Sequence, residues 1–252
     1  MVQKKKKRRM IRRKQRPVIR CVIFDLDDTL YDSFGQQMRT AHRHAAEAMV
    51  AAGLGVSVTA VYRARMKAFR QDPMLRHIDA EVCRIFHSGD PQKIIRIAHD
   101  AYFNTPVGSL KLFRGTRPLL RFLKQRGMRI FLVSFGEPHI QRAKVRALGL
   151  DREPAIEQIF YADRGKLLTK EAAFRRIQRL VGLPPHEILV VGDRPMREIR
   201  AGKELGMHTV RLRHGEFAVQ EARGPEEKPD YEIKNIAEVK RLPFDWGSAS
   251  EI

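Results

Sequence analysis

The chain has 252 residues, an apolar content of 43% and a formal net charge of +20 at pH 7. This length provides for one large domain or two modest ones with a substantial core, and the lack of any apolar run near the roughly 20 residues of a membrane span excludes a transmembrane protein. Only two cysteines occur, Cys21 and Cys83, without the spacing of metal ligands, so a disulfide framework is excluded and a reducing compartment, the cytoplasm, is expected.

Residues 1–17 are predicted to be a disordered basic tail. Residues 1–20 hold 5 Lys and 6 Arg and no acid, which is more than half of the net charge. Self-repulsion and low apolar content prevent such a block from packing. Three interpretations stay open for residues 4–20: a solvated tail without a specific partner, weak contact with nucleic acid or an anionic surface, and a nuclear address if the organism is eukaryotic.

The first packed element is predicted to be a strand at residues 18–24. This apolar run is broken only by Arg20, as expected of a strand buried on both faces in a parallel sheet. It ends on three carboxylates within four residues, Asp25, Asp27 and Asp28. Open α/β sheets bind ligands beyond their strand ends, and two carboxylates held so close favour a cation such as Mg²⁺ between them. An acidic turn or a helix cap is the alternative explanation.

Residues 35–106 are predicted to be an all-helical insert. Four segments carry apolar residues at helical spacing, separated by glycine and proline breaks, and none has a strand pattern. The histidines of this insert lack the paired spacing of metal ligands and are expected at the surface or between helices. Four of its arginines are expected on a solvated helix face or in contact with an anionic substrate. They are Arg63, Arg65, Arg70 and Arg76.

From residue 113 the pattern changes to strands that alternate with helices. This alternation indicates a doubly wound, Rossmann-like parallel sheet with right-handed crossovers. The fold class is therefore α/β, with a core of residues 18–34 and 107–252 into which the all-helical segment of residues 35–106 is inserted. The later strands are predicted at residues 128–133, 159–161, 188–191, 206–210 and, at the edge, 231–233.

Four segments in this order resemble the motifs of the haloacid dehalogenase superfamily. Residues 25–30, Asp-Leu-Asp-Asp-Thr-Leu, are similar to its first motif, DxDx[TV], and residues 190–193, Val-Val-Gly-Asp, to its fourth, GDxxxxD. Ser134, which ends the next core strand, fits the second motif, and Lys170, at the start of the helix before the last acidic strand, fits the third. The resemblance covers almost everything after residue 18, and it implies that the helical insert is a cap over the site.

The resemblance implies phosphoryl transfer with a carboxylate nucleophile. Asp25 would attack phosphorus and form an aspartyl-phosphate, and Asp27 would protonate the leaving oxygen and then activate water. Dehalogenases of the superfamily carry a non-acidic residue at the Asp27 position, so Asp27 favours a phosphatase or phosphotransferase. Ser134 would bind phosphate oxygens. Lys170 would neutralise the phosphate and the nucleophile, with Lys166 as a competitor for that role.

The same motifs imply a Mg²⁺ site. Asp25, the backbone carbonyl of Asp27 and Asp193 would coordinate the ion. The second acid of the fourth motif falls at Glu198 rather than at an aspartate, so its contact with the metal, directly or through water, stays open. Arg194 stands where a small residue is usual in this motif.

These motifs predict a Mg²⁺-dependent phosphatase that acts on a small phosphorylated metabolite under a closing cap. One alternative is an end phosphatase of nucleic acids that uses the basic tail, although a lid of about 70 residues obstructs a polymer. The other is a binding protein without enzyme activity on the same fold. Glu198 and Arg194 give this second alternative modest support, and the intact Asp25 and Asp27 speak against it.

Overall fold

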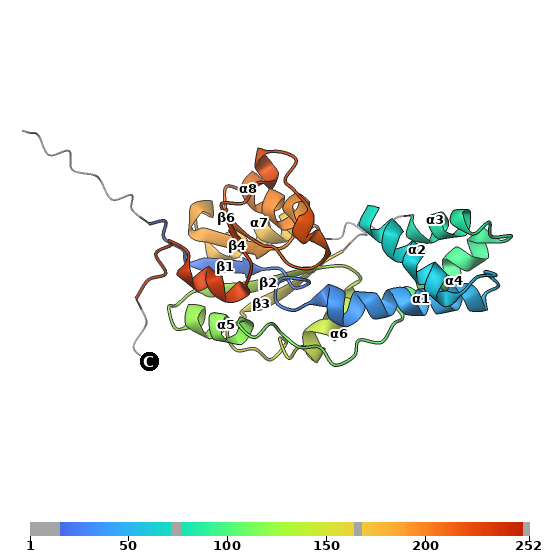
Figure 1. The fold of residues 1–252 in the computed structure, drawn as a ribbon. Coiled ribbons are helices and arrows are strands. Elements are labelled where there is room, and N and C mark those ends of the chain that lie inside the picture. Colours follow the sequence, from blue (N-terminus) through green and yellow to red (C-terminus); the bar gives the residue numbers. More distant parts are fainter. Residues whose placement is uncertain (1–15, 72–76, 164–167, 249–252) are drawn as a thin grey trace, which may run out of the picture.

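The computed structural model describes residues 16–71, 77–163 and 168–248, and within these ranges six parallel strands form one sheet. The strand order is β3-β2-β1-β4-β5-β6, and it reverses direction beside β1. Such an order is that of a doubly wound sheet, so the predicted α/β, Rossmann-like core is confirmed (Figure 1). The strands are β1 (Cys21–Phe24), β2 (Arg129–Phe135), β3 (Gln158–Ala162), β4 (Ile188–Gly192), β5 (His208–Leu212) and β6 (Tyr231–Ile233).

The central strand β1 is buried on both faces. Its four residues are at most 1% exposed, with Cys21 and Ile23 in the core cluster on one face and Val22 and Phe24 in the cluster on the other. This alternation is the period of two that a pleated strand requires. The strand is shorter than predicted because residues 18 and 19 leave the ladder, whereas the N–H of Arg20 still donates to Glu187, directly before β4, at 2.9 Å and its carbonyl accepts from Arg129 of β2 at 3.0 Å. The backbone N–H of Ile19 donates instead to the carbonyl of Asp245, 3.1 Å away.

Helices cover the two faces of the sheet separately. Helices α5 (Thr116–Lys124) and α6 (Pro138–Ala147) contribute to the core on one face, and α7 (Lys170–Val181) and α8 (Arg200–Glu204) to the core on the other. Figure 1 shows the two pairs on opposite sides of the strands. This arrangement leaves the carboxyl ends of the strands uncovered by the core's own helices.

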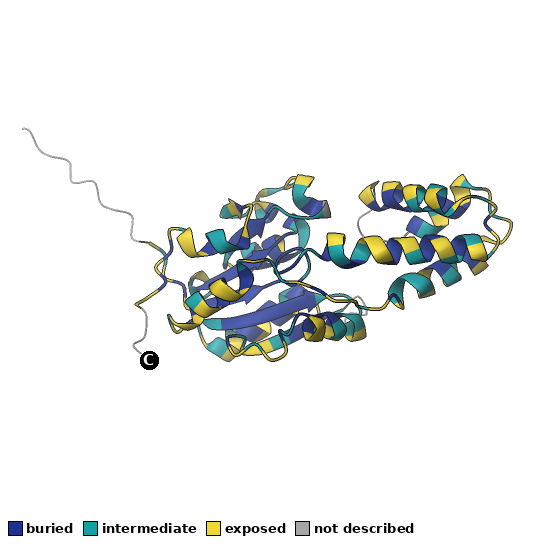
Figure 2. Cartoon of the chain, turned by 60° about the horizontal axis from the view of Figure 1, so that its bottom comes forward, coloured by how far each residue is buried: buried dark blue, intermediate teal, exposed yellow. Residues whose placement is uncertain are grey.

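A separate group of four helices lies beyond that edge (Figure 1). Its buried side chains form their own clusters, and in Figure 2 each helix turns a buried stripe inward and an exposed stripe outward. Helix α4 begins as the sequence indicates, because the Asp90 side chain accepts the N–H of Lys93 at 3.1 Å and Pro91 occupies the first turn. The boundaries given for this insert, residues 35–106, stay a prediction. Its helices are α1 (Arg39–Ala51), α2 (Val58–Gln71), α3 (Ile78–Ile85) and α4 (Pro91–Phe103).

Arg65 is the clearest error in the expectations for the insert. It is 2% exposed and pairs with Asp79 across the helices, so it lies neither on a solvated face nor against a substrate. Before α1, a π-helical turn, η1, spans Phe34–Met38. The positions of Arg76 and of residues 4–15 of the basic tail lie outside the described residues. Among the helices that are described, none has both the length and the apolar character needed to cross a bilayer.

His42 makes the helical insert sensitive to acid. It is fully buried, neither ring nitrogen has a hydrogen-bond partner among the described residues, and burial together with Arg65 lowers its pKa from 6.5 to about 3. The unfolded chain therefore binds a proton below pH 6.5 that the folded chain binds only near pH 3, and stability falls as the pH drops through that window. At pH 5 this linkage costs about 2 kcal/mol relative to neutral pH.

Urea unfolding at pH 7 and pH 5 tests this expectation. We expect His42→Leu, which keeps the packing volume and removes the titrating ring, to recover about 2 kcal/mol of the stability lost at pH 5. His99→Gln, which changes an exposed histidine, is the matched control. An equal loss between pH 7 and pH 5 in wild type and His42→Leu would show that His42 is not the acid-sensitive group.

Candidate active site

Three neighbouring strands deliver polar side chains to one edge of the sheet. Asp25 follows β1, Asp193 follows β4, and Ser134 is the penultimate residue of β2. The backbone N–H of Asp25 donates to the carbonyl of Val191 at 2.9 Å, which extends the ladder between β1 and β4 and fixes the register of the two acids. Parallel pairing therefore brings residues far apart in the sequence to the point where the strand order reverses.

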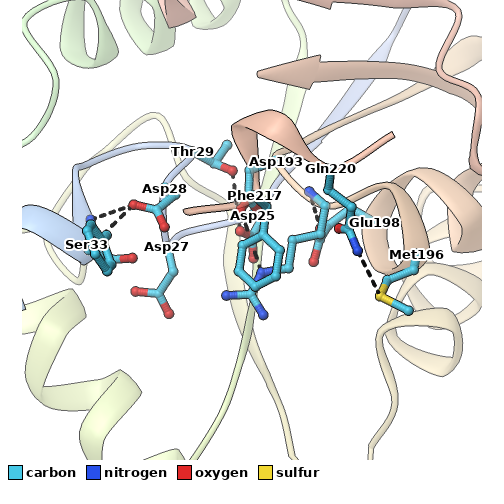
Figure 3. Close-up of polar contacts among 12 residues, drawn as sticks. Asp25, Asp27, Asp28, Thr29, Ser33, Asp193, Met196, Glu198, Phe217 and Gln220 are labelled. Atoms are coloured by element: carbon cyan, nitrogen blue, oxygen red, sulfur yellow. Dashed lines mark hydrogen bonds and ion pairs between the residues drawn. The ribbon is translucent and has the colours of Figure 1, made fainter. Parts of the chain in front are cut away.

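Asp25, Asp193 and Glu198 form a buried cluster of carboxylates (Figure 3). One oxygen from each lies within 4.8 Å of the others, and none of the three residues is more than 6% exposed. Glu198 reaches the cluster from a π-helical turn, Pro195–Ile199. Its side chain crosses Gly192 so closely that a Cβ there would lie 2.6 Å from its Cβ and Cγ, so the glycine of the fourth motif is required for packing.

Asp193 has the environment expected of a metal ligand. Both of its carboxylate oxygens are buried and, among the described residues, accept no hydrogen bond. Burial raises the pKa of Asp193 well above its ordinary value, partly opposed by the guanidinium of Arg194. Buried carboxylates without partners are costly unless a cation compensates them, and hard oxygen ligands suit Mg²⁺. The cluster therefore fits a divalent cation, with Asp25, Asp193 and Glu198 as the side chains that could hold it.

A second acidic group, Asp28, Asp32 and His214, lies next to η1. Its carboxylates already accept backbone hydrogen bonds. Asp28 Oδ1 accepts the N–H groups of Ser33 and Phe34 at 2.9 and 3.2 Å (Figure 3). Asp32 Oδ1 likewise accepts the N–H of a glycine three residues later, at 2.7 Å. The third acid of the first motif thus anchors the turn that leads into the helical insert.

Lys170 contacts the carboxylate cluster directly. Its ammonium bonds both Asp25 and Glu198, and these carboxylates raise its pKa in spite of burial, which acts in the opposite direction. Thr169 caps α7 by accepting the N–H of Ala172 at 3.0 Å, and this fixes Lys170 on the first helical turn. Burial raises the pKa of Asp25 to about 6, against the lowering effect of Lys170. The competing position, Lys166, lies outside the described residues.

Asp27 has three partners that sequence patterns did not identify. Lys144 donates to both of its carboxylate oxygens, at 2.8 and 3.0 Å, and Gln141 donates to one of them at 3.2 Å. The Tyr31 hydroxyl donates to the other at 2.6 Å. Burial raises the pKa of Asp27, but Lys144 and Tyr31 outweigh it, so the net shift is downward. The available signal was the i, i+3 spacing of Gln141 and Lys144 on one helix face.

Ser134 is fully buried and its hydroxyl donates to Gln141 Oε1 at 2.8 Å. Gln141 therefore links Ser134 to Asp27. The backbone of Gly136 lies close to Gln141, because a Cβ there would lie 2.5 Å from Gln141 Nε2, and its φ of +148° favours glycine. Ser134 is thus adjacent to the site, and its contact with phosphate stays a prediction.

A cavity of about 110 Å³ opens between the sheet edge and the helical insert. The core side of its wall includes Asp27, Lys144 and Arg194, and the insert contributes residues of η1 and α4, among them Met38 and Tyr102. The carboxylate of Asp27 and the ammonium of Lys144 thus face a small, partly open space between the core and the helical insert.

Comparison with known proteins finds a matching family model, similar sequences and similar structures. A family model described as haloacid dehalogenase-like hydrolase matches residues 19–206. The chain is 31% identical over 226 residues to the glyceraldehyde 3-phosphate phosphatase of Methanopyrus kandleri, covering 88% of this chain and 96% of that one. It is 30% identical over 235 residues to the protein of the same name from Methanocaldococcus jannaschii, covering 90% and 100%. The fold is similar to the crystal structure of CbbY from Rhodobacter sphaeroides in complex with phosphate, with a TM-score of 0.58, 19% identity and coverage of 88% and 96%.

Proposed function

This chain belongs to the haloacid dehalogenase-like hydrolases, and from that premise we propose that it cleaves the phosphate monoester of a three-carbon metabolite such as glyceraldehyde 3-phosphate. Relatives about 30% identical over most of both chains are phosphatases, so the chain is a phosphatase of a small phosphorylated metabolite. The proposed substrate comes from the names of these relatives. The observation that carries the chemistry is a buried carboxylate, Asp25, bonded to Lys170 and adjacent to two further carboxylates.

In the proposed first step, an Asp25 oxygen attacks phosphorus. A bond forms between that oxygen and phosphorus while the bond between phosphorus and the ester oxygen breaks, which yields an aspartyl-phosphate. The proton needed by the leaving alkoxide comes from Asp27, which becomes a carboxylate. Lys144 favours that carboxylate form, and the negative charge of an incoming phosphate favours the protonated form before transfer.

In the second step, water attacks the phosphorus of the aspartyl-phosphate. Its proton passes to Asp27, and the bond between Asp25 and phosphorus breaks. Inorganic phosphate is released and the free Asp25 carboxylate is restored. Mg²⁺, held by Asp25, Asp193, Glu198 and the backbone carbonyl of Asp27, would supply Lewis-acid polarisation of a phosphoryl oxygen. Lys170 neutralises charge on the nucleophile in both steps.

The small size of the cavity supports a small substrate over a polymer. A volume of about 110 Å³ under the helical insert accommodates a short-chain phosphate ester, whereas the end of a nucleic acid would require the insert to be displaced. Intact acid, base and ammonium groups around this cavity likewise support an enzyme over a binding protein.

An activity panel tests the proposed function. Phosphate release is measured from glyceraldehyde 3-phosphate, an aryl phosphate and a 5′-phosphorylated oligonucleotide, with Mg²⁺ and with a chelator. We expect turnover of the small esters only with Mg²⁺. Faster release from the oligonucleotide than from either small ester would contradict the assignment.

Lys144→Met is expected to lower kcat/KM by about 10- to 100-fold, because Asp27 loses its charged partner while the general acid–base role is worth about 10²- to 10⁴-fold. Arg142→Met is the matched control, since Arg142 is on the same helix but exposed, stacked on Tyr161 away from Asp27. Steady-state kinetics of both variants on the same substrate provide the measurement. Equal losses of kcat/KM in the two variants would mean that activity depends on the integrity of the helix rather than on the contact between Lys144 and Asp27.

A further inference from the structure

Arg194 directly follows Asp193 in the chain, and the fold provides a specific place for its side chain. The guanidinium stacks on the ring of Phe217, with its central carbon 3.9 Å from the ring centroid, and only 14% of the side chain is exposed. Phe217 is itself buried, and its carbonyl accepts a hydrogen bond of 2.7 Å from the buried Arg211. The guanidinium is therefore held in one orientation before any ligand binds.

The hydrogen-bonding capacity of this guanidinium is unused. The nearest carboxylate oxygen, on Asp193, is 3.6 Å from Nε, which is an ion-pair distance but too long for a hydrogen bond. Among the described residues no group accepts a hydrogen bond from the Arg194 side chain, although a guanidinium carries five N–H donors. Because Arg194 lines the cavity, those donors are available to a ligand there.

The two lysines of the site are already engaged. Lys170 bonds Asp25 and Glu198, and Lys144 bonds both oxygens of Asp27. Arg194, by contrast, lies beside Asp193, next to the carboxylate cluster that fits a cation, and on the wall of the cavity that also includes Asp27. A phosphoryl group in transfer from the leaving oxygen to Asp25 would have to lie between these groups.

We propose that Arg194 is a catalytic residue that binds two non-bridging oxygens of the phosphoryl group during transfer. The inference rests on the proposed phosphatase function and adds a residue to it. The planar fork of an arginine matches two phosphoryl oxygens, and the contact strengthens as negative charge spreads over them in the transition state. Arg194 donates hydrogen bonds and keeps its charge; the bonds made and broken remain those at Asp25, phosphorus and the leaving oxygen.

The test compares Arg194→Ala with Arg194→Met. We expect both variants to lose about 10²- to 10³-fold in kcat with a much smaller change in KM. Alanine leaves an open slot over Phe217, so added guanidinium ion at non-denaturing concentrations should raise the kcat of that variant at least about tenfold. Methionine fills the slot and should not be rescued. Arg200→Ala, which removes an exposed arginine paired with Glu204, serves as a control that keeps full activity.

Orthovanadate supplies a second readout that does not depend on turnover. As a mimic of the transferring group, it should bind Arg194→Ala more weakly by a factor similar to the loss in kcat/KM. The proposal is overturned if Arg194→Met retains kcat within about fivefold of wild type, or if guanidinium fails to rescue a folded Arg194→Ala. If the wild-type protein released no phosphate from any substrate of the panel, the phosphatase assignment itself would be refuted. Failure of that assignment and failure of the Arg194 proposal are therefore distinguishable.

Discussion

Asp25→Asn is expected to abolish phosphatase activity, with kcat at least about 10⁴-fold lower than in wild type. The change replaces one oxygen by an amide nitrogen and keeps the shape of the side chain, but an amide cannot form the aspartyl-phosphate. Lys170 retains Glu198 as a partner, so the variant keeps a paired ammonium in the core. Acid-quenched wild-type enzyme should carry phosphate on the peptide that contains Asp25, and the variant should carry none.

Asp28→Asn is the matched control for this experiment. It makes the same chemical change three residues along the chain, at a side chain that is also fully buried. The oxygen that accepts the N–H groups of Ser33 and Phe34 can be kept in an asparagine. We expect its activity to stay within about tenfold of wild type. Measurable turnover in Asp25→Asn above about 1% of wild type, or an equal loss in the control, would rule out Asp25 as the nucleophile.

Asp193→Asn is expected to change activity and stability in opposite directions. Activity at saturating substrate should fall about 10³-fold, because the loss of a metal ligand removes several kcal/mol of transition-state stabilisation. Without metal, however, the variant should be more stable than wild type. Three carboxylate oxygens lie within 4.8 Å of one another in a buried site, and the substitution removes one negative charge from that cluster.

The sign of the stability change follows from the raised pKa of Asp193. An acid whose pKa is higher in the folded state than in the unfolded state loses stability as the pH rises above its ordinary value near 4, and an amide does not. With a chelator at pH 7 we therefore expect a gain of about 1–2 kcal/mol, a rise in Tm of several degrees. Mg²⁺ should raise the Tm of wild type and leave that of the variant nearly unchanged.

Thermal unfolding with chelator and with Mg²⁺ measures both quantities on the same samples. A lower Tm for Asp193→Asn in chelator would mean that Asp193 is satisfied by Arg194 in the metal-free protein and that the cluster is not strained. An equal Mg²⁺ response in wild type and variant would place the ion elsewhere. Neither result bears on the nucleophile, which is tested by the kcat of Asp25→Asn and by the trapped phosphoenzyme.

Much of the fold could be predicted because its signals are local. The strand at Cys21–Phe24 is apolar on both faces. Helix α4 begins at a proline that follows its N-cap aspartate, and α7 begins directly after Thr169, which caps it. Each of these features depends on residues within one turn or one pleat of each other. The meeting of Asp25 and Asp193 at one edge also follows from local information, because parallel strands place their carboxyl ends together.

Contacts between distant elements could not be predicted in this way. Lys144 and Asp27 are 117 positions apart, and their pairing depends on how helix α6 is rotated against the loop after β1. Arg65 was expected on a solvated face or against an anion because of its charge, yet it lies on the buried face of α2 with Val61 and Phe69, and α3 brings Asp79 to it. Periodicity shows which face of a helix is apolar, but it does not show which partner lies across from a charged residue on that face.

The type and order of the elements, the edge of the sheet at which the acids gather, and the reaction class that their motifs resemble could be inferred from residue patterns. How that edge is completed depends on tertiary packing. Glu198 enters the carboxylate cluster because a π-helical turn brings its side chain across Gly192, which has no Cβ to obstruct it. Arg194 faces the cavity because Phe217, from a separate segment, lies under its guanidinium. These placements depend on packing between segments that are distant in the chain or irregular in backbone, and no local pattern of residues encodes such packing.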